Sequence, residues 1–133
     1  MATEEFGWGD DPTIHKEAEL WRRIPPWDDY IVYDQRQERW RPSSMAFEDD
    51  ADGQPMSVFL AAETPGPDTV LAGHAEYGLT SITAGLAREC QQGIARDPLP
   101  DQPAHAVVFG KKTSSVKRRL ARESKWVVPP PVK

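Results

Sequence analysis

The sequence predicts a small α+β domain with a largely antiparallel sheet, two or three helices and disordered termini. One observation behind this prediction is that segments typical of strands dominate the first half of the chain, whereas helical and strand patterns mix in the second half. A second is that the chain has no internal repeat and no regular alternation of strands with helices, which would favour a doubly wound parallel sheet. Its 133 residues suit one domain with a real core.

Composition divides the chain into three parts. Residues 1–16 mix Gly, Asp and Glu without a period, so we expect a flexible acidic tail in which only Phe6 and Trp8 could dock. Residues 17–128 should form the single domain. Residues 129–133 should form a proline-rich C-terminal tail, and the 13 prolines of the chain suggest that loops and tails take a sizeable share of it.

Four segments are expected to be extended, and a fifth short run could complete the core. Glu19–Ile24 alternates imperfectly and stops at two prolines, which cannot donate hydrogen bonds to a β-ladder. Three segments are rich in β-branched and aromatic residues, which fit a pleated, half-buried surface: Tyr30–Tyr33, Met56–Ala61 and Ala104–Phe109. The short run Trp126–Val128 could close the core.

The connections between these segments are polar. Residues 35–39 should form a turn, and residues 40–47 should then approach the body of the domain. The acidic run over residues 48–53 begins like an EF-hand calcium loop, but its twelfth position is Phe59, which has no carboxylate. We therefore expect a solvated loop that ends in a tight Asp-Gly turn.

Two helices are expected in the middle of the chain. Asp68 can cap a short helix over residues 69–76. Apolar residues at helical spacing favour another helix from about Thr83, which Gly93 would end at its C′ position. Alternating apolar residues in the same stretch leave open whether residues 79–92 are helix or strand.

A third helix should follow the last long strand. Thr113 or Ser114 can cap a segment that carries Val116 and Leu120 on its apolar side and most of its basic residues on the other.

Charge is distributed unevenly along the chain. Residues 1–110 carry 8 basic and 20 acidic side chains, whereas residues 111–133 carry 8 basic side chains and one acidic side chain. This asymmetry could mark a nucleic-acid contact, a protein contact, or a basic segment that lies on its own acidic body. We expect at most weak, non-specific nucleic-acid binding, because the acidic body repels a polyanion.

The sequence indicates a cytoplasmic protein. No apolar run approaches the roughly 18 residues of a membrane span, and the N-terminus lacks the basic start and apolar stretch of a signal peptide. The single cysteine, Cys90, cannot make an internal disulfide, which agrees with a reducing compartment.

Motifs for common catalytic and cofactor chemistry are missing. His15, His74 and His105 are far apart in sequence, and none has a second ligand at a metal-site spacing. No strand is followed by a phosphate-binding or dinucleotide-binding glycine motif, and there is no G-x-S-x-G elbow. The sequence therefore indicates no catalytic residue, no metal and no cofactor.

Two residues with reactive side chains are expected to be structural. Cys90 would share a helical face with apolar residues, so burial as a small hydrophobe is favoured over a role as nucleophile. His105 would project on the same side of its strand as Val107 and Phe109, which favours a buried, hydrogen-bonded histidine at the end of the sheet.

The best small ligand site combines Arg41, Ser43 and Ser44. A guanidinium can grip a carboxylate or phosphate with two hydrogen bonds while nearby hydroxyls also donate. The alternative is structural, with Arg41 paired to an acidic neighbour and the serines capping a turn. If His105 converges with these three residues, the pocket should take a nucleotide or an NAD-like anion.

Several short motifs resemble those of small, uncharacterised bacterial proteins. They are R-P-S-S-x-x-F (Arg41 to Phe47), M-S-V (Met56 to Val58) and R-D-P-x-P-x-x-P-A-H-A (Arg96 to Ala106). The resemblance spans roughly residues 20–126. It implies a bacterial origin and brings no established activity or fold.

The order of some residues also resembles ADP-ribosyltransferase-like enzymes. Arg22 or Arg23, followed by Ser43-Ser44, would match an arginine strand followed by a serine strand. The catalytic glutamate of that family has no counterpart in this sequence.

Together these observations favour a binding or accessory protein that acts through protein-protein contacts and has no catalysis of its own. The residues expected to contact the partner are arginines and tryptophans, the types that dominate interface energetics: Trp21, Arg22, Arg23, Trp40, Arg118, Arg119 and Arg122. The alternatives are a small enzyme or sensor that binds a nucleotide or NAD-like anion, and a weak nucleic-acid binder through residues 111–125. Neither the partner nor the oligomeric state follows from the sequence.

Overall fold

The computed structural model describes residues 7–131 and has the α+β fold that the sequence predicts. Six strands form one sheet and two form a separate hairpin. The strands are β1 (Glu19–Ile24), β2 (Ile31–Asp34), β3 (Arg39–Pro42), β4 (Met56–Leu60), β5 (Gly78–Thr83), β6 (Gly93–Arg96), β7 (His105–Phe109) and β8 (Lys125–Val128). The large sheet runs in the order β6-β7-β4-β1-β5-β8 with antiparallel neighbours throughout, and β2 pairs with β3.

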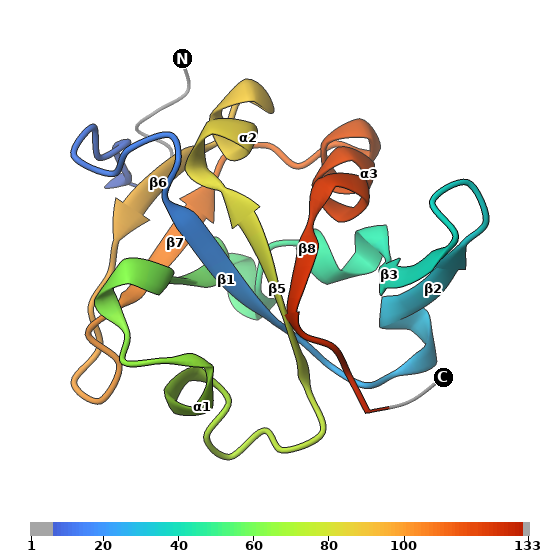
Figure 1. Ribbon diagram of the computed structural model, residues 1–133. Coiled ribbons are helices and arrows are strands. Elements are labelled where there is room, and N and C mark those ends of the chain that lie inside the picture. The colour runs from blue at the N-terminus through green and yellow to red at the C-terminus, as the bar shows by residue number, and fades with distance from the viewer. Residues whose placement is uncertain (1–6, 132–133) are drawn as a thin grey trace.

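Helices lie on both sides of the large sheet (Figure 1). In Figure 1, α2 and α3 lie at the top of the view and α1 lies at the bottom. The helices are α1 (Pro67–Val70), α2 (Ala84–Glu89) and α3 (Ser114–Glu123). Short 3-10 turns are η2 (Asp28–Tyr30), η3 (Ser44–Phe47), η4 (Ala51–Gly53) and η5 (Ala61–Glu63).

The main core forms between one face of the sheet and the elements α2, α3 and η3. Leu20 and Ile24 of β1 are fully buried there, together with Phe47 of η3 and Leu120 of α3. Each such side chain contributes about 1.5 to 3 kcal/mol through burial. The contact of α3 with η3 therefore ties the C-terminal helix to the segment that follows the β2-β3 hairpin.

The opposite face of the sheet carries two smaller clusters. Phe59 and Leu79 pack with Val70 of α1 in one cluster, and Val107 packs with Phe109 in the other. Because both faces of the central strands are covered, β7 is buried along its whole length. This explains why the sequence of β7 is apolar without strict alternation.

The structure confirms the strands expected around Glu19–Ile24, Tyr30–Tyr33, Met56–Ala61 and Ala104–Phe109. The turn expected at residues 35–39 connects β2 to β3. The sequence did not predict β3, because its Arg-Trp-Arg-Pro stretch has little apolar alternation of its own. The pairing with β2 makes it a strand.

The region left open over residues 79–92 contains both kinds of element. It begins with most of β5 and continues into α2, whose N-cap is Thr83 as expected from the helical pattern. The C′ role predicted for Gly93 is wrong, because Gln91 carries the positive φ of 66° and Gly93 begins β6. A Cβ at Gly93 would overlap the ring of Phe109, so close strand packing requires glycine there.

The helix predicted over residues 69–76 begins earlier and is much shorter. Helix α1 starts with Pro67 at its first turn and Gly66 at its N-cap, and it ends at Val70. Proline fits the first turn because its missing N–H has no partner there. Thr113 caps α3 as predicted, since its side chain accepts a hydrogen bond from the backbone N–H of Val116 at 3.2 Å.

Residues 7–16, for which the sequence suggested a flexible tail, pack on the domain. Ile14 is buried in the main core, and Trp8 packs on the cluster around Val107. Asp10 accepts hydrogen bonds from Arg88 at 3.1 Å and from the backbone N–H of Ile94 at 2.9 Å. The acidic residues of this stretch thus have basic and backbone partners far along the chain, which no local pattern reveals. Phe6 lies outside the described residues.

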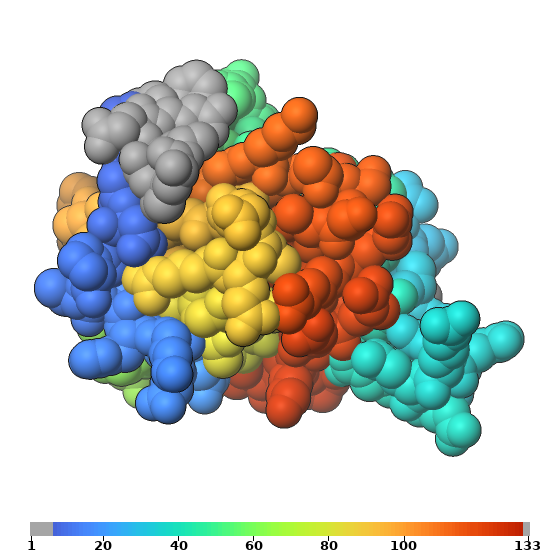
Figure 2. Space-filling model, turned by 90° about the horizontal axis from the view of Figure 1, so that it is seen from above, coloured from blue at the N-terminus to red at the C-terminus, as the bar shows by residue number. Residues whose placement is uncertain are grey.

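The β2-β3 hairpin projects from the large sheet beside α3 (Figure 2). Arg39 donates to the backbone oxygen atoms of Arg122 and Ser124 at 3.2 and 2.8 Å. The indole of Trp126 donates to the backbone oxygen of Trp40 at 3.0 Å. These contacts fix the hairpin against the C-terminal end of α3 and create a pocket between the two elements.

Within the described range, none of the helices has the length and apolarity that crossing a membrane requires.

Candidate functional site

A pocket of about 520 Å³ lies between the β2-β3 hairpin and α3, and we call it the arginine pocket. Arg41 comes from β3, while Arg118 and Arg122 come from α3, where their spacing of four residues places them on one side of the helix. The residues that line it are Val32, Tyr33, Asp34, Gln35, Arg36, Arg41, Ser43, Ser44, Arg118 and Arg122. Candidate ligand residues and candidate partner residues from the sequence therefore meet in one place.

The arginine pocket has an excess of positive charge. Its single carboxylate, Asp34, pairs with Arg41 at 2.7 Å. The hydrogen bond from Arg41, together with that from the backbone N–H of Gln37, keeps the pKa of Asp34 below its ordinary value, so this pair stays ionised. Among the described residues, the structure shows no ion pair to the side chains of Arg36, Arg118 or Arg122.

The two serines of this pocket have different roles. Ser43 is buried, and its hydroxyl donates to the backbone oxygen of Asp29 at 2.6 Å and accepts from the backbone N–H of Met45 at 3.2 Å. It is therefore the N-cap of η3. Ser44 is partly exposed and lines the pocket. The structural alternative considered for Arg41 and the serines thus applies to Arg41 and Ser43.

His105 does not line the arginine pocket. It is buried in β7, and its ring contacts the ring of Phe59 edge to face. Its Nε2 lies 3.1 Å from the hydroxyl of Ser57, and its Nδ1 lies 2.9 Å from the backbone oxygen of Asp97. The four-residue site expected from Arg41, Ser43, Ser44 and His105 is therefore not assembled.

A second pocket, of about 350 Å³, opens beside β1 and β4, and we call it the serine pocket. Its lining residues are Arg22, Arg23, Pro25, Tyr30, Met45, Ala46, Glu48, Asp49, Asp50, Ala51, Ser57 and Phe59. Ser57 is its only hydroxyl-bearing aliphatic side chain among these residues.

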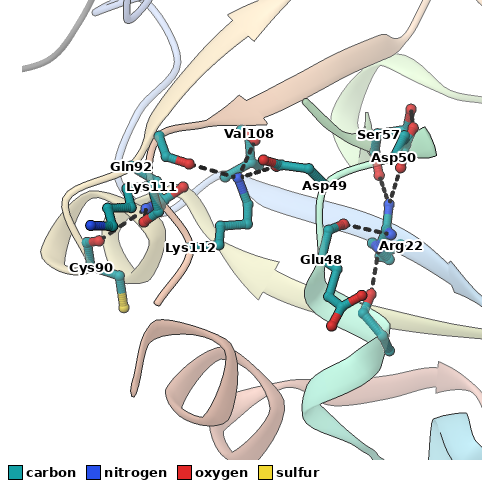
Figure 3. A network of polar contacts seen from close by, with 12 residues as sticks. Arg22, Glu48, Asp49, Asp50, Ser57, Cys90, Gln92, Val108, Lys111 and Lys112 are labelled. Carbon is teal, nitrogen blue, oxygen red and sulfur yellow. Dashed lines mark hydrogen bonds and ion pairs between the residues drawn. The ribbon is translucent and has the colours of Figure 1, made fainter. Parts of the chain in front are cut away.

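Arg22 lines the serine pocket and forms a network of polar contacts with neighbouring segments (Figure 3). Its guanidinium donates to the backbone oxygen atoms of Ala46 at 2.8 Å, Ser57 at 2.7 Å and Glu48 at 3.3 Å, and it pairs with Asp50 at 3.5 Å. Burial lowers the pKa of Arg22, and the charge of Asp50 opposes this shift. Arg22 therefore holds the segment after η3 against the sheet and is not free for a partner.

Each residue of the acidic run Glu48-Asp49-Asp50 is paired with a different basic residue. Lys117 of α3 contacts Glu48 at 3.1 Å. The nearly buried ammonium of Lys112 contacts Asp49 at 2.6 Å (Figure 3), and Arg22 contacts Asp50. This pairing explains why a run that resembles the start of a calcium loop lies against the domain. No cluster of metal-binding side chains exists within residues 7–131.

The other residues expected to contact a partner divide between interior and surface. Trp21 is partly buried and packs against the cluster that contains Phe59. Arg23 lies 4.9 Å from the centre of the Phe59 ring. Arg119 pairs with Glu89 and Glu123, and these contacts raise its pKa above the ordinary value. Trp40 is exposed, as are Arg118 and Arg122.

The layout expected from ADP-ribosyltransferase-like enzymes is not formed. Arg22 and Arg23 lie on β1 and line the serine pocket, whereas Ser43 and Ser44 line the arginine pocket. Ser43 and Ser44 also lie at the start of a 3-10 turn instead of a strand.

Cys90 is buried in the main core, as the sequence predicted. Burial raises the pKa of its thiol above the ordinary value, which disfavours the thiolate that a nucleophile requires.

Sequence reasoning missed Ser57 and Asp97 as members of a polar site. The signal was present, because Ser57 lies in the M-S-V motif and Asp97 and His105 lie in the R-D-P-x-P-x-x-P-A-H-A motif. Only the antiparallel pairing of β4 with β7 brings these segments together.

A scan against protein-family models, a search of curated proteins and a search of solved structures each found no match to this chain.

Proposed function

We propose that this protein is a binding protein whose arginine pocket takes an acidic segment of a protein partner. The observation that carries the proposal is the convergence of Arg36, Arg118 and Arg122, three guanidinium groups without a carboxylate partner among the described residues, around one open pocket. Guanidinium groups bind carboxylates with two parallel hydrogen bonds. The proposal includes the cytoplasmic location that the sequence predicts.

Charge favours this pocket over the rest of the basic C-terminal segment. Lys112, Lys117 and Arg119 are paired with carboxylates of the domain itself. The pairing leaves Arg118 and Arg122 as the basic side chains of α3 that face an open pocket. An acidic peptide would be attracted to this pocket, whereas a long polyanion would also be repelled by the protein, whose formal net charge is -5.

The test is fluorescence anisotropy with a labelled hexaglutamate peptide at low salt, using wild type, Arg118→Glu and Lys111→Glu. Lys111 is the matched control, because it is also an exposed basic residue and does not line the pocket. We expect saturable binding that Arg118→Glu weakens at least about tenfold, or about 1.4 kcal/mol, and that Lys111→Glu changes by less than about twofold.

Equal losses in the two variants, or no saturable binding by the wild type, would refute the proposal. Parallel titrations with ATP, NAD and inorganic pyrophosphate test the alternative of a nucleotide or NAD-like anion, here as a ligand of the arginine pocket. Tighter binding of one of these ligands than of the peptide would replace the acidic peptide by that ligand.

A further inference from the structure

Ser57 lies in a chain of polar contacts that reaches from the serine pocket into the sheet. Its hydroxyl lies 3.1 Å from Nε2 of His105. On the other side of the imidazole, Nδ1 lies 2.9 Å from the backbone oxygen and 3.3 Å from a carboxylate oxygen of Asp97. Both Asp97 atoms are acceptors, so Nδ1 is the donor of this pair, and in that tautomer Nε2 is an acceptor that competes with Oδ2 of Asp50 for the single proton of the Ser57 hydroxyl.

The order hydroxyl, imidazole, carboxylate is the arrangement that activates a serine as a nucleophile. We propose that Ser57 is a nucleophile, that His105 is its general base, and that the serine pocket takes a small carboxylic ester. This activity goes beyond ligand binding in the arginine pocket, and it uses different residues in a different pocket.

The elements around Ser57 hold this geometry in place. Strand pairing places Phe59 of β4 opposite His105 of β7, and the two rings meet edge to face at 5.5 Å. The backbone N–H of Asp97 donates to the backbone oxygen of His105 at 3.0 Å, so Asp97 is fixed beside the imidazole by two separate contacts. His105 is buried, whereas Ser57 is partly exposed and lines the pocket.

Asp50 contacts the same hydroxyl. Its Oδ2 accepts a hydrogen bond from Ser57 at 2.5 Å, and its Oδ1 pairs with Arg22 (Figure 3). Arg22 also donates to the backbone oxygen of Ser57 at 2.7 Å. Asp50 and Arg22 therefore fix the position of the Ser57 side chain, and we assign Asp50 as a positioning residue.

Arg23 brings positive charge to the same pocket as Ser57. It lines the serine pocket beside Phe59, and its Nη1 contacts His74 and the backbone oxygen of Val70. Within residues 7–131 no carboxylate forms an ion pair with Arg23. Such a preorganised cation in a partly desolvated site stabilises the negative charge that develops on a carbonyl oxygen.

The chemical step balances with the ester and water alone. Ser57 Oγ forms a bond to the carbonyl carbon while its proton passes to Nε2 of His105, and the alcohol leaves with that proton when the C–O bond of the ester breaks. Water then attacks the acyl-serine, His105 takes its proton, and breakage of the serine C–O bond returns this proton to Oγ and releases the acid.

A fluorophosphonate probe tests the nucleophile directly, because phosphonylation of a serine releases fluoride and leaves a stable adduct. The wild-type protein is incubated with the probe either native or unfolded in urea, and the adduct is located by peptide mass spectrometry. We expect one adduct per native chain, on Ser57, and none on the unfolded chain. No native adduct, an adduct on another residue, or equal labelling after unfolding would overturn the proposal.

Variants separate the roles in the same assay. Ser57→Ala should abolish labelling, whereas Ser81→Ala, a control at another partly exposed strand serine, should label as wild type. His105→Gln should slow labelling at least about a hundredfold, the usual size of general-base catalysis. Asp50→Asn should slow it less than about tenfold and leave its pH profile unchanged. A larger loss in Asp50→Asn than in His105→Gln would assign the base to Asp50 and overturn the role of His105.

Hydrolysis of p-nitrophenyl acetate gives a second readout that does not depend on the probe. Native wild type should release p-nitrophenol faster than Ser57→Ala. Circular dichroism establishes that each variant is folded. Equal rates for folded Ser57→Ala and wild type would overturn the esterase activity, while peptide binding in the arginine pocket would be unaffected.

Discussion

The charged side chain of Arg22 connects three segments of the chain. Its guanidinium donates to the backbone oxygen atoms of Ala46, Glu48 and Ser57 and pairs with the carboxylate of Asp50. Arginine suits this position because its planar fork donates in several directions at once, which the point charge of lysine does not. Arg22, which the sequence predicted to contact a partner, therefore stabilises the fold.

Arg22→Met should lower the free energy of unfolding by about 3 kcal/mol, because it leaves buried carbonyl groups and Asp50 without their donor. Urea denaturation measures this difference. Arg36→Met is the matched control, because Arg36 is exposed, and it should change the stability by less than about 0.5 kcal/mol. Similar effects of the two substitutions would contradict the role assigned to Arg22.

Cys90 gives a prediction of pH dependence. Burial raises the pKa of its thiol in the folded protein, so the folded state keeps the proton at a pH where the unfolded chain begins to lose it. The contribution of Cys90 to stability is therefore complete below the thiol pKa of the unfolded chain and is lost as pH rises through the higher pKa of the folded state.

The reaction of Cys90 with a disulfide reagent such as DTNB measures this effect. At pH 8 the native protein should react far more slowly than the urea-unfolded chain, in which the thiol is exposed and ionises normally. Comparable rates in the two states would show that Cys90 is accessible and has an ordinary pKa.

At the scale of elements, α3 is the helix on which the arginine pocket depends. It begins at the Thr113 N-cap, buries Leu120 in the main core, and presents Arg118 and Arg122 to the hairpin. Its C-terminal end receives the hydrogen bonds of Arg39. Loosening α3 should therefore disturb both stability and the pocket.

Thr113→Ala should lower the free energy of unfolding by about 1 kcal/mol, because the N–H of Val116 loses its capping acceptor. Ser115→Ala is the control within the same helix. Ser115 is exposed beyond the cap, and alanine has the higher helix propensity, so this substitution should be neutral or slightly stabilising. Thermal unfolding of both variants decides between a capping role and a general effect of removing a hydroxyl.

At the scale of the whole molecule, much of the basic C-terminal segment is neutralised by the acidic body. Lys112 pairs with Asp49, Lys117 with Glu48, and Arg119 with Glu89 and Glu123. Of the explanations considered for the charge asymmetry, a segment that lies on its own body accounts for these residues. Arg118 and Arg122 are the exceptions that face the arginine pocket.

Nucleic-acid binding should accordingly be weak and strongly dependent on salt. Labelled double-stranded DNA and RNA, titrated at 50 and 200 mM salt, should bind without sequence preference at about 50 mM and lose nearly all affinity at about 200 mM. The triple variant Arg118→Glu/Arg119→Glu/Arg122→Glu should abolish the remaining binding. Tight binding by the wild type at 200 mM salt would instead identify nucleic acid as the partner.

The sequence by itself determined the elements whose signals are local. β-Branched and aromatic runs predicted β2, β4 and β7, and the Thr113 cap with the spacing of Val116 and Leu120 predicted α3. It also predicted that Cys90 is buried, because apolar periodicity reports which side of an element faces a core. These properties depend on residues within a few positions of one another.

Only the tertiary structure decided which distant residues share a site. The strand β3 exists because β2 offers it hydrogen bonds, and Gly93 joins β6 because Phe109 leaves no room for a side chain. The pairing of β4 with β7 places His105 beside Ser57 and away from Arg41, and the packing of α3 on η3 and β3 places Arg118 beside the hairpin. The order of the strands determines which side chains are neighbours in a sheet, and this order cannot be read from the local sequence.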